Sequence, residues 1–173
     1  MNIKKELLRE HSKRQANRIA RYACRSNSNF KELIQCYSSH DYVLAQRAAW
    51  SVSIAGRMNP KLVAPHIKYL VDVISRKDVH NAVIRNSVRI LEAINIPKKY
   101  QGKVMQACFG FLENYSVPGA IKAYSMTTLY NLSKKYPEIK GELKSIIEDR
   151  REQETPAFKS RGRKILFDLN QRE

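Results

Sequence analysis

The sequence predicts an all-α protein, specifically an α-solenoid in which antiparallel helix pairs stack on one another. Three observations support this fold class: apolar residues recur at helical spacing, prolines separate the helical runs, and one helical phrase repeats at a fixed interval. The alternation of apolar and polar residues that is typical of exposed strands is missing, and glycine and proline occur only six times each in 173 residues.

Three amphipathic runs each follow a break that contains proline. The runs that begin after Asn59, Ile96 and Tyr136 carry apolar residues at positions i, i+3, i+4 and i+7. Proline is tolerated in a first helical turn because its missing N–H would have no partner within the helix. Together with the runs between them, they predict helices at 2–11, 13–26, 29–38, 41–57, 61–76, 79–95, 98–115, 118–135, 138–152 and 157–170.

The repeated phrase begins with "DYVLAQRAAW" at residue 41 and has counterparts that start at residues 79, 117 and 155, each 38 residues further on. When the four phrases are aligned at this interval, Arg47, Arg85 and Arg161 occupy the same position, or column, of the alignment. A small residue and then a large apolar residue occupy two further columns, which predicts helices that pack closely against equivalent neighbours. The small column holds Ala49, Ser87 and Ser125, and the large column holds Trp50, Val88 and Met126.

We expect residues 1–173 to form a single domain of about four to five helical repeats. One helix pair cannot cover both of its apolar flanks, so each unit shields the next and the end units need polar outer faces. The expected parts are N-terminal capping helices at 1–38, repeats at 40–76, 78–115 and 117–152, and a C-terminal cap at 154–173.

The phrase at residue 41 resembles the second helix of a HEAT repeat, whose pattern is close to Asp-x-x-x-x-x-Arg-x-Ala-Ala. Asp41 and Arg47 match that pattern, Asp78 and Arg85 match it more loosely, and the later units lack the acid. The chain is thus similar to short HEAT-like proteins of bacteria, which implies a right-handed superhelix. In HEAT repeats the acid and the arginine hydrogen-bond between neighbouring units, so the resemblance implies that these four residues form a structural ladder.

Charge is the strongest compositional signal. The chain has 32 Lys plus Arg against 16 Asp plus Glu, a formal net charge of +16. The surplus is spread along the chain, with 11 basic and 4 acidic residues in 1–60, 9 and 4 in 61–120, and 12 and 8 in 121–173. It favours a polyanionic partner, either nucleic acid or an acidic protein surface, although many basic proteins bind no nucleic acid.

Two sets of basic residues are candidates for binding such a partner. The first, the N-terminal basic face, consists of Arg14, Arg18, Arg21 and Arg25, whose spacings of four and three place them on one side of a helix. Their mutual repulsion would be relieved by a polyanion; alternatively, the face is only a solvated end cap. The second set, the predicted basic groove on the inner helices, consists of Arg57, Arg89, Lys122, Lys134, Lys135, Lys159 and Arg163.

The sequence offers no recognisable catalytic, metal or cofactor site. The four histidines are isolated from one another and from cysteine or carboxylate clusters, and no glycine-rich phosphate loop is present. We therefore expect a non-enzymatic scaffold without a cofactor or a metal. The alternative is a nucleic-acid repair enzyme, because the chain distantly resembles the HEAT-like DNA glycosylases that excise alkylated bases; Glu92 is the candidate acid.

The cysteines and the apolar runs indicate a cytoplasmic protein. Cys24, Cys36 and Cys108 lie far apart in the sequence, which favours free thiols in a reducing compartment. The N-terminus lacks the apolar segment of a secretory signal, and no run approaches the ~20 apolar residues needed to cross a bilayer. We therefore expect no membrane partner.

Overall fold

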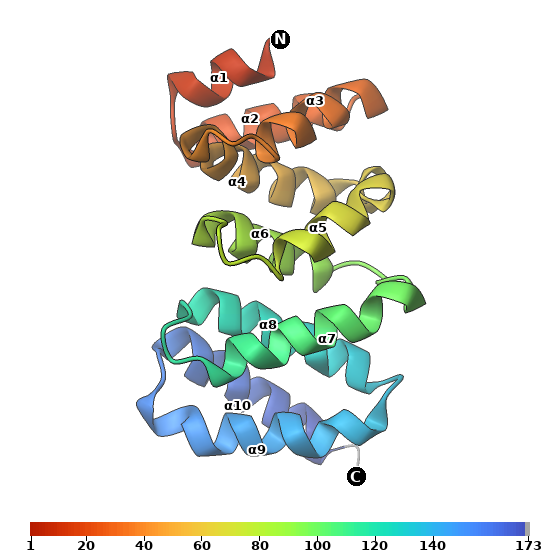
Figure 1. Ribbon diagram of the computed structural model, residues 1–173, viewed down its shortest axis with the longest axis vertical. Helices are drawn as coiled ribbons and strands as arrows, with labels where there is room; N and C mark the ends of the chain where they lie inside the picture. The colour runs from red at the N-terminus through yellow and green to blue at the C-terminus, as the bar shows by residue number, and fades with distance from the viewer. Residues whose placement is uncertain (172–173) are drawn as a thin grey trace. The chain divides into compact units, whose positions relative to one another are not determined.

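The computed structural model describes residues 1–171 as helices joined by turns, with no strand in that range (Figure 1). The predicted all-α fold is confirmed. The chain divides into two compact units, Met1–Ile90 and Leu91–Glu173, which we call unit 1 and unit 2. Residues 172 and 173, the end of the expected C-terminal cap, lie outside the described residues.

Unit 1 is built around α4, a helix that packs against α1, α2 and α3. The apolar face of α2 explains this packing, because its alanines and Ile19 are buried while its arginines are exposed. The helices of this unit are α1 (Ile3–Arg9), α2 (Lys13–Ala23), α3 (Asn27–Tyr37), α4 (Tyr42–Met58), α5 (Ile67–Val73) and α6 (Asn81–Leu91).

Unit 2 is built around α8, which contacts both α7 and α10 (Figure 1). Met126 and Leu129 of α8 and Phe158 of α10 are fully buried, in agreement with the contact between these two helices. The helices of this unit are α7 (Lys98–Glu113), α8 (Gly119–Ser133), α9 (Lys140–Arg150) and α10 (Pro156–Asn170).

Short polar side chains fix where several helices begin. Ser12 Oγ accepts a hydrogen bond from the backbone N of Gln15 at 3.1 Å and so caps α2. Ser26 caps α3 and Thr155 caps α10 in the same way. These side chains satisfy N–H groups that have no partner within the helix, which is why each helix starts at the residue that follows.

The predicted continuous helix over 61–76 is wrong. Two single turns of 3₁₀ helix, Pro60–Leu62 and Ala64–His66, replace its first half, and α5 spans only Ile67–Val73. The cause is Pro65, which lacks an N–H group and disfavours helical backbone at the residue before it.

The small column of the repeat is buried throughout, and so are two of the three residues of the large column. Ala49, Ser87 and Ser125 are each 0% exposed, so neighbouring helices approach closely at these positions. Val88 and Met126 are also fully buried. Trp50 is half-buried, and its ring meets the His11 ring edge-on at a centroid distance of 5.6 Å.

Tyr37 joins α3 to α6 inside unit 1. Its ring is 1% exposed, and its hydroxyl contacts the carbonyl oxygen of Val83 at 3.0 Å and the hydroxyl of Ser87. Burial raises the pKa of Tyr37, because an ionised phenol would lose its hydration there. The helix pair is therefore held together by a buried hydrogen-bond pair as well as by apolar contact.

A buried ion cluster joins α8, α9 and the start of α10 in unit 2. Lys122 Nζ of α8 pairs with Glu154 Oε1, and Arg150 Nη2 of α9 lies 3.5 Å from the same oxygen. Arg150 Nη1 also donates to the carbonyl oxygen of Glu113 at 2.5 Å, and its guanidinium stacks 3.6 Å from the centre of the Tyr115 ring. Two cations thus share one carboxylate, and carbonyl and aromatic groups supply the remaining stabilisation.

We expect the three free thiols to differ in reactivity, with Cys24 reacting first. Cys36 and Cys108 are buried, whereas Cys24 is half-buried. Burial raises the pKa of all three thiols and brings that of Cys108 to about 12. When the folded protein is treated with a disulfide reagent at about pH 8, Cys24 should be modified much faster than the other two cysteines. In denaturant all three thiols should react at similar rates. Fast modification of Cys108 in the folded protein would contradict the described packing.

Candidate functional site

The N-terminal basic face lies along α2 and the turn after it, because Arg25 follows the end of the helix by two residues. All four arginines are exposed, and the three on α2 lie within about 60° of arc around the helix axis. The opposite side of α2 is buried against α3 and α4, so the helix is held in place from behind. The structure therefore brings the four predicted residues together on a fixed support.

The same arginines line a hollow of about 780 Å³. Asn17 and Tyr22, also on α2, complete most of its wall together with Met1. A volume of this size falls within the ~300–1,000 Å³ typical of ligand sites. Asn17 and Tyr22 are not among the residues predicted from the sequence, although each directly neighbours one of these arginines along α2.

The hollow is strongly positive. Residues 11–31 contain six basic residues and no acidic one. Of the four arginines only Arg18 pairs with a carboxylate, Glu6 at 2.8 Å; within residues 1–171, Arg14, Arg21 and Arg25 have no acidic partner. Unit 1 as a whole carries 17 basic and 6 acidic residues, a net charge of +11.

Glu6 is the carboxylate that borders this surface. Gln15 Nε2 donates to its Oε2 at 2.7 Å and to its backbone carbonyl at 2.8 Å, and Arg9 lies 3.6 Å away. The hydrogen bond from Gln15 lowers the pKa of Glu6, and the charge of Arg18 adds to that effect against the opposing influence of burial. Glu6 therefore ties α1 to α2 and positions Arg18 at the edge of the hollow.

Tyr22 gives the hollow an aromatic wall. The side chain is half-buried, and the guanidinium of Arg25 lies 5.7 Å from the centre of its ring. Its backbone carbonyl accepts a hydrogen bond from Asn29 Nδ2 at 3.2 Å, which ties the end of α2 to α3. The ring is thus held beside cations, an arrangement suited to stacking against a flat ligand.

The residues of the predicted basic groove do not share one surface in the same way. Arg57 is exposed near the C-terminal end of α4 and Arg89 is half-buried on α6, both in unit 1. The other members, Lys122, Lys134, Lys135, Lys159 and Arg163, belong to unit 2.

In unit 2, Lys134 and Lys135 lie at the end of α8 and line separate hollows. Lys134 lies 4.8 Å from the centre of the Tyr130 ring in a hollow of about 300 Å³. Lys135 donates to Asn95 Oδ1 at 3.3 Å in another of about 350 Å³. On α10, Lys159 donates to the carbonyl oxygen of Glu152 at 3.0 Å and Arg163 is exposed.

Lys122 requires a correction to its predicted binding role. It is 1% exposed, and its ammonium group is paired with Glu154 in the buried ion cluster. A charge held in this way is not available to a ligand, so Lys122 serves the packing of unit 2.

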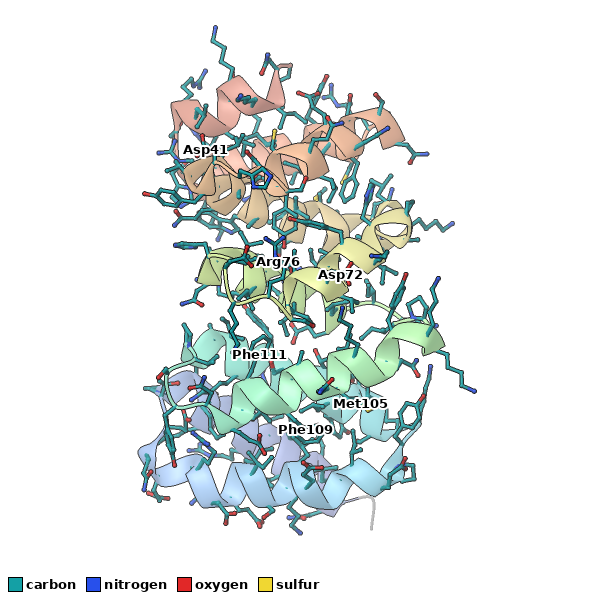
Figure 2. All side chains as sticks on the ribbon, viewed as in Figure 1. Asp41, Asp72, Arg76, Met105, Phe109 and Phe111 are labelled. Carbon is teal, nitrogen blue, oxygen red and sulfur yellow. The ribbon has the colours of Figure 1, made fainter. Side chains whose placement is uncertain are left out.

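Asp41 and Arg47 have structural roles, but their partners are backbone groups. Asp41, which Figure 2 shows at the start of α4, accepts from the backbone N of Val43 at 3.0 Å and so caps its own helix. Arg47 Nη1 donates to the carbonyl oxygens of Leu7 and Leu8 at 3.2 and 2.8 Å, the last turn of α1. Both residues therefore stabilise helix ends.

Asp78 and Arg85 also differ from the ladder that the resemblance implies. Asp78 pairs with Arg76 through a two-pronged contact on the surface, and Arg85 is exposed. The carboxylate of Asp78 is thus paired with an arginine two residues earlier in the sequence, whereas the resemblance implies an arginine of a neighbouring repeat.

A family model for the HEAT repeat domain matches residues 3–169. The chain belongs to the HEAT repeat family. No curated protein and no solved structure matches the chain. The match covers helices of both units, in agreement with the stacked helix pairs seen in each.

The HEAT repeats of unit 2 contain a cross-helix ion pair that the sequence pattern did not reveal. Arg161 Nη1 of α10 lies 3.2 Å from Glu92 Oε2 and also contacts the hydroxyl of Thr127 on α8. Arg161 belongs to the repeated arginine column, but its acid stands outside the aligned phrase. Glu92, the candidate acid of the alternative repair enzyme, is thus half-buried in a structural ion pair.

Among residues 1–171 no three or more histidine, cysteine or carboxylate side chains lie close enough together to hold a metal ion. No helix in this range combines the length and the apolar character required to cross a membrane. Of the two predicted binding sets, the N-terminal basic face is the one whose residues all line a single hollow.

Proposed function

We propose that the protein is a non-enzymatic HEAT-repeat binding module that holds an anionic macromolecule, nucleic acid or an acidic protein surface, against the N-terminal basic face. The observation that carries this proposal is the hollow beside α2, which four exposed arginines line and where only Arg18 pairs with a carboxylate. An anionic partner would relieve the repulsion between arginines one turn apart.

Rigidity supports the same function. The cap at Ser12, the bonds between Gln15 and Glu6, and the buried face of α2 hold the arginines' helix in one position before a ligand arrives. A prearranged cationic surface loses less conformational entropy on binding than a mobile one. The stacked repeats thus act as a scaffold for the charged helix.

The other predicted sites receive less support. Arg57, Arg89, Lys134, Lys135, Lys159 and Arg163 remain proposed secondary contacts. The alternative of a base-excising repair enzyme depends on Glu92, and the pairing of Glu92 with Arg161 gives it no support. The three free cysteines fit the proposed cytoplasmic location.

The proposal is tested by titrating fluorescein-labelled heparin, a generic polyanion, with the protein at low salt. The variant R14Q/R18Q/R21Q/R25Q should bind at least about tenfold more weakly than the wild type. The matched control K98Q/K99Q/K140Q/K164Q removes the same charge from residues of unit 2 that lie outside the predicted binding sets, and it should retain most of the affinity. Equal losses in both variants would indicate attraction by net charge alone, and a loss confined to the control would move the site to unit 2.

Replacing Glu6 with glutamine should strengthen heparin binding about two- to fivefold, because it removes the carboxylate nearest to the N-terminal basic face. Glutamine retains an oxygen that can accept the bond from Gln15. Glu152→Gln, an equal change of charge at an exposed residue of unit 2, is the control. Weaker binding by the Glu6 variant would show that Arg18 must be oriented by an anion in order to act.

A further inference from the structure

We propose that the partner of the N-terminal basic face is a single strand of nucleic acid, with its phosphates along the arginines and a base against Tyr22. This inference rests on the proposed function and narrows it to one class of macromolecule. Four features of the hollow support it: the row of charges, the identity of the cations, the aromatic wall and the free acceptor on Asn17.

The charges form a single row. Between Arg14, Arg18 and Arg21 the helix rises by about 6 and 4.5 Å, and Arg25 continues the row in the turn after Ala23. The phosphates of a strand also follow one another in a single row, whereas carboxylates on a folded protein surface are spread over two dimensions. A single row of cations therefore suits one strand better than an acidic protein face.

All four cations of the row are arginines, although the chain contains more lysines than arginines, 17 against 15. A guanidinium group offers a planar fork of donors that can bind two phosphate oxygens at once, and it can also stack on a base. Attraction of any polyanion by charge alone would be served equally well by lysine. The fork suits carboxylates as well as phosphates, but the capacity to stack on a base is useful only with a nucleic acid, which is the partner that the composition of the row fits best.

Tyr22 and Asn17 supply contacts to the bases. Tyr22 lines the hollow beside Arg25, where its ring can stack on an unpaired base. Asn17 Nδ2 is occupied by the carbonyl oxygen of Lys13 at 2.7 Å, which leaves Oδ1 to accept a hydrogen bond from a base. A duplex would keep its bases stacked inside the helix and would offer Tyr22 nothing to stack on.

Fluorescence anisotropy with a labelled single-stranded oligonucleotide of mixed sequence tests the inference directly. With four phosphate contacts, log K should fall with log salt concentration with a slope of about −2.8, and Arg21→Gln should reduce that slope by about 0.7. Tyr22→Leu should weaken binding at least about fivefold without changing the slope, whereas Tyr22→Phe should bind like the wild type. The matched duplex and poly-L-glutamate should bind more weakly than the single strand.

A second measurement does not depend on a variant that folds. A strand that carries 5-iodouracil should cross-link on irradiation to the peptide that contains Tyr22. Cross-links confined to other peptides, or equal affinity for the duplex or for polyglutamate, would overturn the single-strand assignment and leave the proposed function standing. Failure of every polyanion, heparin included, to bind the N-terminal basic face would overturn both.

Discussion

Replacing Glu154 with alanine will lower the free energy of unfolding by about 3–5 kcal/mol. The side chains of Lys122 and Glu154 are only 1% and 3% exposed, and that of Arg150 is 11% exposed. Removal of the carboxylate leaves two cations next to one another in the interior of unit 2. Carbonyl groups and the Tyr115 ring offset part of this cost, but neither carries a full negative charge.

Urea denaturation followed by circular dichroism measures this effect. Glu152→Ala is the matched control, because that side chain is 83% exposed and its loss should change the free energy of unfolding by less than about 0.5 kcal/mol. The double variant K122M/E154L should be more stable than Glu154→Ala, since it removes charges of both signs. A loss below about 1 kcal/mol for Glu154→Ala would mean that the cluster is hydrated and not buried.

Replacing Tyr37 with alanine should lower the free energy of unfolding by about 3–5 kcal/mol, and replacing it with phenylalanine by about 1–3 kcal/mol. Alanine removes a ring that is 1% exposed and leaves a cavity between α3 and α6. Phenylalanine fills the space but leaves the fully buried Ser87 hydroxyl without the phenol. Comparison of the two variants by urea denaturation therefore separates packing from hydrogen bonding.

The same residue makes a prediction about alkaline pH. Because burial raises the pKa of Tyr37 above its ordinary value of 10.0, its contribution to stability is complete below that pH and declines as the pH rises beyond it. The Tyr37→Phe variant lacks this contribution, so its stability should fall less steeply than that of the wild type above about pH 10. If the stability of the wild type and of Tyr37→Phe fell in parallel above pH 10, the Tyr37 phenol would ionise as readily in the folded protein as in the unfolded one.

The stacking of helices could be predicted from the sequence because its determinants repeat. Small residues at 49, 87 and 125 and large ones at 88 and 126 recur at one interval, and all of them are buried. The prediction of a continuous helix over 61–76 was wrong, because Pro65 restricts the backbone of the residue before it although the apolar pattern continues through it. Periodicity predicts which face of a segment is buried better than it predicts where the helix begins.

The two predicted binding surfaces show why one could be read from the sequence and the other could not. Three arginines of the N-terminal basic face lie on one helix and the fourth lies two residues after its end, so their spacing alone predicts that they share a side. The predicted basic groove depended on tertiary contacts between distant segments. Lys122, a member of that groove by prediction, is buried and pairs with Glu154, 32 residues away in the sequence.

The central claim, that α2 is the ligand-binding element of a HEAT-repeat scaffold, is tested most directly by NMR. Backbone amide signals of the ¹⁵N-labelled protein would be followed during titration with heparin at low salt. We expect the largest chemical-shift changes in residues 13–25, with the buried residues of α8 and α10 unchanged. Shift changes centred on unit 2, or spread evenly over exposed lysines of both units, would contradict the claim.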